Sequence, residues 1–239
     1  MPSDTNGRTV SPYRSSILIV GVAWSVVAAA TPPPPPAVAS PWRVEAEDPA
    51  TRVGYGRDGT IDIDAPAGVT LWHGRRIDGP VAISFRAVAV SDGGRNDRVS
   101  DLNAFWMATD PAVADGSVLS RPRSGAFADY DTLNTYYVGI GGNRNTTTRM
   151  RRYVGTAGVR PLLPQHDRSD PAAMLVPNRW TTIRLIADNH HIAVERDGKL
   201  LFVMDDPAPY RTGWFGLRTT LSHLRIRDVR ITALKEPHR

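Results

Sequence analysis

Two central segments of the sequence, residues 101–106 and 134–149, combine aromatic rings with hydrogen-bonding side chains. Sugar rings present apolar C–H faces and polar rims, so a groove for them needs aromatic platforms with donors and acceptors alongside. The candidate substrate-binding residues are Asp101, Asn103, Trp106, Asn143, Thr147 and Arg151, and the candidate catalytic residues are Tyr136, Tyr137 and Arg149. Together they indicate a carbohydrate site.

The alternation of side chains along a strand limits which of these aromatic rings can lie in one groove. Tyr136 and Tyr137 are adjacent, so in a strand they point to opposite faces. One of the two tyrosines, and also Trp106, could therefore be an ordinary core residue.

The same alternation places Thr147, Arg149, Arg151 and Tyr153 on one strand face. This row suits a carboxylated ligand, because arginine binds a carboxylate through two parallel hydrogen bonds. The alternative is a solvated polar face paired with nearby aspartates, where each ion pair contributes only ~0–1 kcal/mol.

The types of residue available favour elimination over hydrolysis. Glycoside hydrolysis normally needs two carboxyl groups, ~5–5.5 Å apart for retention or ~6.5–9.5 Å for inversion, and no such pair is evident in the sequence. Elimination from a uronate needs a group that neutralises the carboxylate, a base and an acid, and Arg149 and Asn143 could neutralise it. The candidates for proton transfer, given a suitable pKa shift, are Tyr136, Tyr137, His166 and His223.

Composition is that of an ordinary packed domain, with 41% hydrophobic and 22% charged residues. The net charge of +5 comes from scattered basic residues, whereas nucleic-acid binders usually concentrate them in one helix or stripe. Cysteine is absent, which excludes disulfides and thiolate metal sites. No histidine spacing supports a metal site either, but Asp129 and Asp131 are candidate turn residues or ligands of a structural calcium ion.

The first residues have the pattern of an export signal. Arg8 and Arg14 precede an apolar run at residues 17–30. Ala28–Ala30 and Ala37–Ala39, on either side of a proline run, both fit a small-x-small cleavage site, and we expect cleavage after Ala39. We expect residues 1–39 to be a Sec-type signal peptide and proline-rich linker, and residues 40–239 to be one secreted or periplasmic domain without stable membrane insertion. An uncleaved membrane anchor is the alternative.

The mature region shows short alternating runs separated by Gly, Pro, Asp and Asn, with no convincing helical periodicity. Nine segments have this form: 81–89, 102–108, 135–141, 146–154, 180–187, 191–195, 200–204, 213–219 and 224–233. Asp197-Gly198 predicts a tight hairpin, and a change of apolar phase near Arg227-Asp228 predicts a β-bulge. The sequence thus predicts an all-β protein with two packed antiparallel sheets.

The order of a strand at Trp180, the Asp197-Gly198 hairpin, the segment 213–218 and a closing strand at 229–231 resembles the concanavalin A-like lectin and glucanase jelly rolls. The two central segments resemble, more narrowly, a bacterial branch associated with degradation of rhamnogalacturonan and other glycans. The resemblance implies a curved sandwich with a sugar groove on its concave sheet, and Arg218 in segment 213–218 is a further substrate-binding candidate. The catalytic Glu-x-Asp-x-x-Glu cluster of jelly-roll glucanases is absent, which disfavours a retaining glucanase.

From these observations we expect a secreted carbohydrate-active protein, a polysaccharide lyase acting on uronate-containing or pectic-type glycan. Its partner would be an acidic polysaccharide or oligosaccharide rather than nucleic acid, and no cofactor is implied. A non-catalytic glycan-binding module is one alternative, and a hydrolase or an enzyme acting on keto-glycosides is another.

Overall fold

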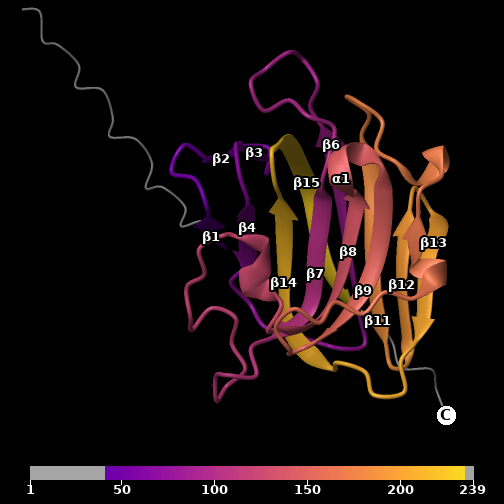
Figure 1. Cartoon of the computed structure of the whole chain (residues 1–239). Coiled ribbons are helices and arrows are strands. Elements are labelled where there is room, and N and C mark those ends of the chain that lie inside the picture. The colour runs from indigo at the N-terminus through magenta and orange to yellow at the C-terminus, as the bar shows by residue number, and fades with distance from the viewer. Residues whose placement is uncertain (1–40, 235–239) are drawn as a thin grey trace, which may run out of the picture. The chain divides into compact units, whose positions relative to one another are not determined.

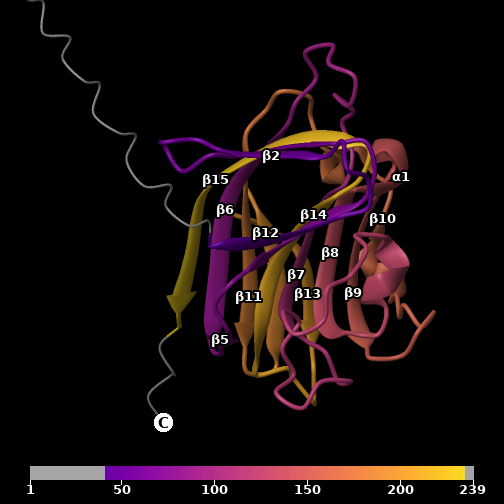
Figure 2. The ribbon, with the colours of Figure 1, turned by 90° about the vertical axis from the view of Figure 1, so that its left-hand side faces the viewer.

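The computed structural model describes residues 41–234, which form two antiparallel β-sheets packed face to face (Figures 1 and 2). The expected all-β sandwich is therefore confirmed. The expected signal peptide and linker, residues 1–39, lie outside the described residues.

Sheet A contains, in spatial order, β1 (Trp42–Ala46), β4 (Val69–His73), β14 (Thr212–Thr219), β7 (Leu102–Thr109), β8 (Asn134–Gly141), β9 (Thr147–Val154) and β10 (Asp167–Arg168), with β5 (Ile77–Asp78) also paired to β14. Sheet B contains β13 (Lys199–Asp205), β12 (His191–Arg196), β11 (Thr181–Asp188), β6 (Val81–Ala89), β15 (Ser222–Ala233), β3 (Ile61–Ala65) and β2 (Arg52–Tyr55). The helical elements are short: α1 (Gly142–Asn145), η1 (Phe127–Tyr130), η2 (Pro164–His166) and η3 (Pro171–Ala173).

All nine predicted strands are present, displaced by at most two residues at either end. The hairpin is confirmed, because Asp197 and Gly198 have φ of 51° and 73° and connect the paired residues Arg196 and Lys199. The bulge is confirmed as well, since the register of β15 against β6 shifts between Arg227 and Arg230.

The main core lies between the two sheets, where the inward positions of the strands alternate with polar outward ones. In β6, for example, Val81, Ile83 and Phe85 are buried, whereas Ser84 and Arg86 are half-buried on the other face. Large side chains such as Trp106, Tyr136 and Phe215 fill the space between the sheets.

A second apolar cluster lies on the outer face of sheet A. It comprises Trp72, Phe105, Ala108, Val118, Tyr130, Leu133, Tyr137, Tyr153 and Trp214. Three of these, Val118, Tyr130 and Leu133, belong to residues 110–133, which we call the covering segment because they pack on the strands from outside. The outer face of sheet A is thus closed where this segment lies.

Buried Glu45 of β1 attaches the covering segment to the sheet. Its carboxylate accepts hydrogen bonds from Tyr130 Oη (3.0 Å), from the backbone N–H of Arg123 (3.1 Å) and from Trp72 Nε1 (3.0 Å). A carboxylate so buried needs such donors to offset its desolvation, so Glu45 both requires and fixes this arrangement.

Candidate functional site

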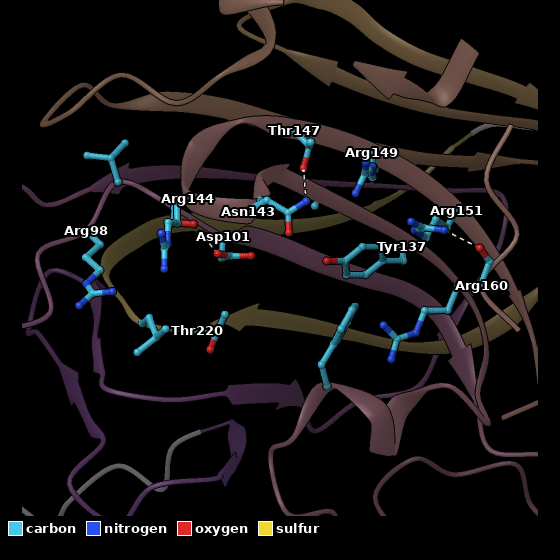
Figure 3. Close-up of a pocket in the computed structure, with 16 residues that line it drawn as sticks. Arg98, Asp101, Tyr137, Asn143, Arg144, Thr147, Arg149, Arg151, Arg160 and Thr220 are labelled. Carbon is cyan, nitrogen blue, oxygen red and sulfur yellow. Dashed lines mark hydrogen bonds between the residues drawn. The ribbon is translucent and has the colours of Figure 1, made fainter. Parts of the chain in front are cut away.

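A pocket of about 650 Å³ opens on the outer face of sheet A beside the covering segment (Figure 3). Its walls come from the chain just before β7, from β8, α1 and β9, and from Phe127, Arg160 and residues 220–221. The site therefore depends on several segments that are distant in sequence and meet only in the folded sandwich.

Tyr137 and Gly139 of β8 form the floor, with Asp101 beside them and the Tyr137 hydroxyl directed toward Asp101 (Figure 3). A Cβ atom at position 139 would lie 2.7 Å from Tyr137 Oη and 3.0 Å from Asn103 Oδ1. The missing side chain of Gly139 thus leaves room for both polar atoms. Asn103 Oδ1 is buried and accepts no hydrogen bond within residues 41–234.

Burial is the main influence on the pKa values of Tyr137 and Asp101. It raises the pKa of the Tyr137 phenol well above its usual value, and the nearby Tyr153 and Asp101 raise it further. Tyr137 therefore remains a neutral hydroxyl that can donate a hydrogen bond. Burial also raises the pKa of Asp101, although hydrogen bonds from Ser100 and Asn103 and the charge of Arg218 oppose that shift.

The turn between β8 and β9 is left-handed over three consecutive residues that are not glycine. Asn143, Arg144 and Asn145 have φ of 52°, 59° and 62°, a conformation that costs roughly 1–2 kcal/mol per residue, less for asparagine. Asn145 holds the turn through two hydrogen bonds to the backbone of Leu175, at 3.0 and 2.9 Å. Asn143 donates to Thr147 Oγ1 at 3.2 Å. Such strained conformations cluster at functional sites. Here the turn places Asn143 and Arg144 at the pocket.

The pocket is strongly basic. Its lining contains one carboxylate, Asp101, and five arginines, which are Arg98, Arg144, Arg149, Arg151 and Arg160. Arg149 already forms a two-pronged ion pair with Asp167 (2.8 and 3.2 Å), and Arg160 pairs with Asp131 (2.7 Å). Arg151 donates to the backbone carbonyl of Arg160. Among residues 41–234, the guanidiniums of Arg98 and Arg144 have no partner.

Six of the predicted site residues line this pocket together: Asp101, Tyr137, Asn143, Thr147, Arg149 and Arg151. The chemical role assigned to each remains a prediction. Asn103 does not line the pocket, because it is buried next to Gly139, its partner on the neighbouring strand.

Trp106 and Tyr136 were expected in the groove, and this expectation is wrong. Both are fully buried between the sheets. Trp106 Nε1 donates to the carbonyl of Ile186 at 3.4 Å, and Tyr136 Oη donates to buried Asp206 at 2.6 Å. Strand alternation accounts for both positions, since the neighbouring residues Phe105 on β7 and Tyr137 on β8 point outward.

The two histidines proposed for proton transfer also lie elsewhere. His166 is buried, with Nε2 2.9 Å from the carbonyl of Val203, in contact with Phe202. His223 lies on sheet B between Asp97 (2.8 Å) and Asp62 (2.9 Å). Neither lines the pocket, so the prediction that these two histidines belong to the site is wrong.

Arg218 is buried beneath the covering segment rather than exposed in the pocket. Its guanidinium donates to Thr70 Oγ1 (3.0 Å) and to the carbonyl of Gly125 (2.7 Å), and it lies over the rings of Phe127 and Tyr130. Burial lowers its pKa. The residue therefore joins the covering segment to sheet A, and its charge still reaches Asp101 and Tyr137.

Sequence reasoning missed Arg98, Arg144, Arg160 and Phe127 as lining residues. Arg144 lies inside one of the two central segments, where its position between two asparagines in a turn was a usable signal. Arg98 and Arg160 fall in stretches without strand alternation, so no local pattern places them.

The candidate calcium ligands are engaged by protein donors. Asp131 accepts from Arg160 and from the N–H of Gly158, and Asp129 accepts from the N–H and hydroxyl of Ser124. Within residues 41–234, no group of three or more acidic or histidine side chains is placed to hold a metal ion. A structural calcium ion stays an untested prediction.

The described part of the chain has no helix long and apolar enough to cross a membrane.

Two packed antiparallel sheets form a β-sandwich, and similarity to solved structures identifies its fold as the galectin-like, concanavalin A-like jelly roll that the resemblance implied. The chain belongs to the family described as "Domain of unknown function (DUF6250)", whose profile matches residues 63–229, more than half of its length. No curated protein matches the sequence.

Solved structures show the same fold. A carbohydrate-binding module, CBM66 from Bacillus subtilis, is 10% identical with a TM-score of 0.54, over 81% of this chain and 96% of that one. A protein of unknown function with a galectin-like fold from Bacillus subtilis is 15% identical, with a TM-score of 0.55 over 80% and 88% of the two chains. The VIP36 exoplasmic/lumenal domain, solved with Ca²⁺ and Man3GlcNAc, is 12% identical, with a TM-score of 0.52 over 83% and 86%. At these identities the similarity concerns the fold alone.

Proposed function

We propose that this protein is an exported glycan-binding protein whose pocket on sheet A holds an acidic oligosaccharide or a segment of an acidic polysaccharide. The observation that carries the proposal is the pocket itself, in which five arginines and a single carboxylate surround a tyrosine floor. Two of the fold relatives support it by their descriptions, one as a carbohydrate-binding module and one as a mannoside-bound domain.

The lining matches what a sugar requires. The ring of Tyr137 lines the pocket and can contact a C–H face, while Asp101, Asn143 and Thr147 supply donors and acceptors for hydroxyl groups. The surplus of guanidiniums attracts anions, and in a partly enclosed pocket this attraction is screened less than on an open surface. A uronate residue satisfies all three properties of the pocket.

Binding is better supported than hydrolysis, because Asp101 is the one carboxylate that lines the described pocket and hydrolysis usually needs two. Elimination is the second candidate. The carboxyl of Asp101, whose pKa is raised by burial, faces the neutral Tyr137 hydroxyl, so the two groups could act as base and acid.

The test is isothermal titration of the purified protein with oligogalacturonate, oligoglucuronate and their carboxyl-reduced, neutral counterparts. We expect saturable binding of at least one acidic oligosaccharide, weaker binding of its neutral counterpart, and affinity that falls with added salt. No preference for any acidic form would contradict the proposal. Ultraviolet absorbance of the same mixtures decides the second candidate, since an unsaturated uronate accumulates only if elimination occurs.

Export is part of the proposal and has its own test. The basic residues followed by an apolar run at residues 17–30 support it. N-terminal sequencing of the protein recovered outside the bacterial inner membrane should begin at Ser40, and retention of residues 1–39 would favour the anchor instead.

A further inference from the structure

We propose that Arg98 and Arg144 are the residues that bind the acidic group of the ligand, whereas Arg149 and Arg160 maintain the shape of the pocket. This inference rests on the proposed function and sharpens it, because it identifies which part of the pocket distinguishes a uronate from a neutral sugar. It also differs from the sequence-based expectation, in which Arg149 had that role.

The first argument is the state of the guanidiniums. Arg98 and Arg144 are exposed, line the pocket, and have neither a hydrogen bond nor an ion pair with any residue in 41–234. The carboxylate of a ligand can therefore form paired hydrogen bonds with either guanidinium without displacing a protein acceptor. For Arg149 it would have to displace the two-pronged contact with Asp167.

The second argument is that both arginines extend from one junction. The N–H of Asp101 donates to the carbonyl of Gly141 at 3.1 Å, and the hydroxyl of Ser100 donates to the same oxygen, also at 3.1 Å. This ties the chain just after Arg98 to the chain just before Arg144. Figure 3 shows both arginines at the same side of the pocket, across Asp101 from Arg149, Arg151 and Arg160.

The third argument is that the backbone of Arg144 is fixed in advance. The turn is held at Asn145 by Leu175, and Gly141 permits the close approach, since a Cβ there would lie 2.5 Å from Asn145 Oδ1. On the other side, Ser222 Oγ donates to the carbonyl of Arg98 at 2.9 Å. Preorganised backbones lose less conformational freedom on binding, which makes each contact more effective.

The experiment compares Arg98→Ala, Arg144→Ala and the double variant with wild type, using oligogalacturonate and oligoglucuronate and their carboxyl-reduced forms as probes. The measured quantity is the ratio of affinities for the acidic and the reduced oligosaccharide. Each single change should lower this ratio roughly tenfold, as expected for a charge-assisted hydrogen bond, and the double variant should bind both forms nearly equally. Arg144→Lys should recover only part of the ratio, because lysine keeps the charge but lacks the planar fork.

Arg57→Ala is the matched control. Arg57 is exposed in the turn between β2 and β3 of sheet B, so its removal lowers the net charge equally but outside the pocket, and the ratio should not change. Arg149→Ala should weaken both forms of the oligosaccharide to a similar degree. A ratio that is unchanged in the double variant, or that is lost only in Arg149→Ala, would overturn the inference while the proposed function stood. Absence of acidic preference in wild type would instead overturn the proposed function.

Discussion

The adjacent residues Tyr136 and Tyr137 of β8 test whether the inner face of the strand serves stability and its outer face serves ligand binding. Tyr136 Oη donates to Asp206 at 2.6 Å and accepts from the N–H of Tyr210 at 3.1 Å, and Asp206 is itself buried. The Tyr137 hydroxyl forms no hydrogen bond within residues 41–234 and faces the pocket. Replacing each with phenylalanine removes one oxygen atom from opposite faces of the same strand.

The magnitudes follow from those contacts. Tyr136→Phe loses one hydrogen bond to a charged group, worth ~1.5–3 kcal/mol, and one to a backbone N–H, worth ~0.5–1.5 kcal/mol. We therefore expect the free energy of unfolding to fall by about 2–4 kcal/mol, and Tm by roughly 5–15 °C for a domain of this size. Tyr137→Phe should change the free energy of unfolding by no more than about 0.5 kcal/mol.

The assay is urea unfolding at pH 7 followed by tryptophan fluorescence, together with titration of oligogalacturonate and oligoglucuronate. We expect Tyr137→Phe to weaken oligosaccharide binding and Tyr136→Phe, at a temperature where it is folded, to leave it unchanged. Equal losses of stability in the two variants, or loss of binding in Tyr136→Phe alone, would refute the assignment of the two faces.

Two further predictions concern His223 on sheet B and Gly139 in the pocket floor. The pKa of His223 is raised, because hydrogen bonds and charges of Asp97 and Asp62 outweigh the lowering effect of burial, so its contribution is complete below the unfolded pKa and disappears as pH rises through the folded value. The stability lost in His223→Gln, measured by urea unfolding, should accordingly be larger at pH 5.5 than at pH 8.5, and a loss that does not vary with pH would contradict the ion pairs. Gly139→Ala should strongly reduce oligosaccharide binding, because its Cβ would lie 2.7 Å from Tyr137 Oη. The control Gly198→Ala, in the distant hairpin where the φ of 73° disfavours a side chain and no atom lies within 4 Å, should destabilise the fold by ~1–2 kcal/mol and leave binding intact.

Much of the fold could be predicted from the sequence because its long strands carry a clear alternation. The missed strands are short and depend on their neighbours. β10 has two residues and β2 is a largely exposed edge strand of four, so neither can show a period. β3 is a different case, since Ile61 and Ile63 alternate with Asp62 and Asp64, and that signal was overlooked.

The candidate site was predicted in part, for a comparable reason. The parity of β9 correctly placed Thr147, Arg149 and Arg151 on one face. Parity also showed that only one of Tyr136 and Tyr137 could face outward, but the sequence does not reveal which face the covering segment leaves open. The sequence likewise could not show that Arg149 has a partner in Asp167 and that Arg144 has none among the described residues, since both facts depend on contacts made in three dimensions.

In the turn at residues 142–145, which is left-handed from Asn143 to Asn145, different residues set the backbone path and the charge presented to the pocket. Its path is set by Gly141 and by the contact of Asn145 with Leu175, while the Arg144 side chain is exposed and forms no hydrogen bond within residues 41–234. A substitution at position 144 by a residue that tolerates the left-handed backbone, such as asparagine, can therefore alter the charge of the pocket with little effect on the fold. The shape of this turn and the charge that it presents are therefore set by different residues.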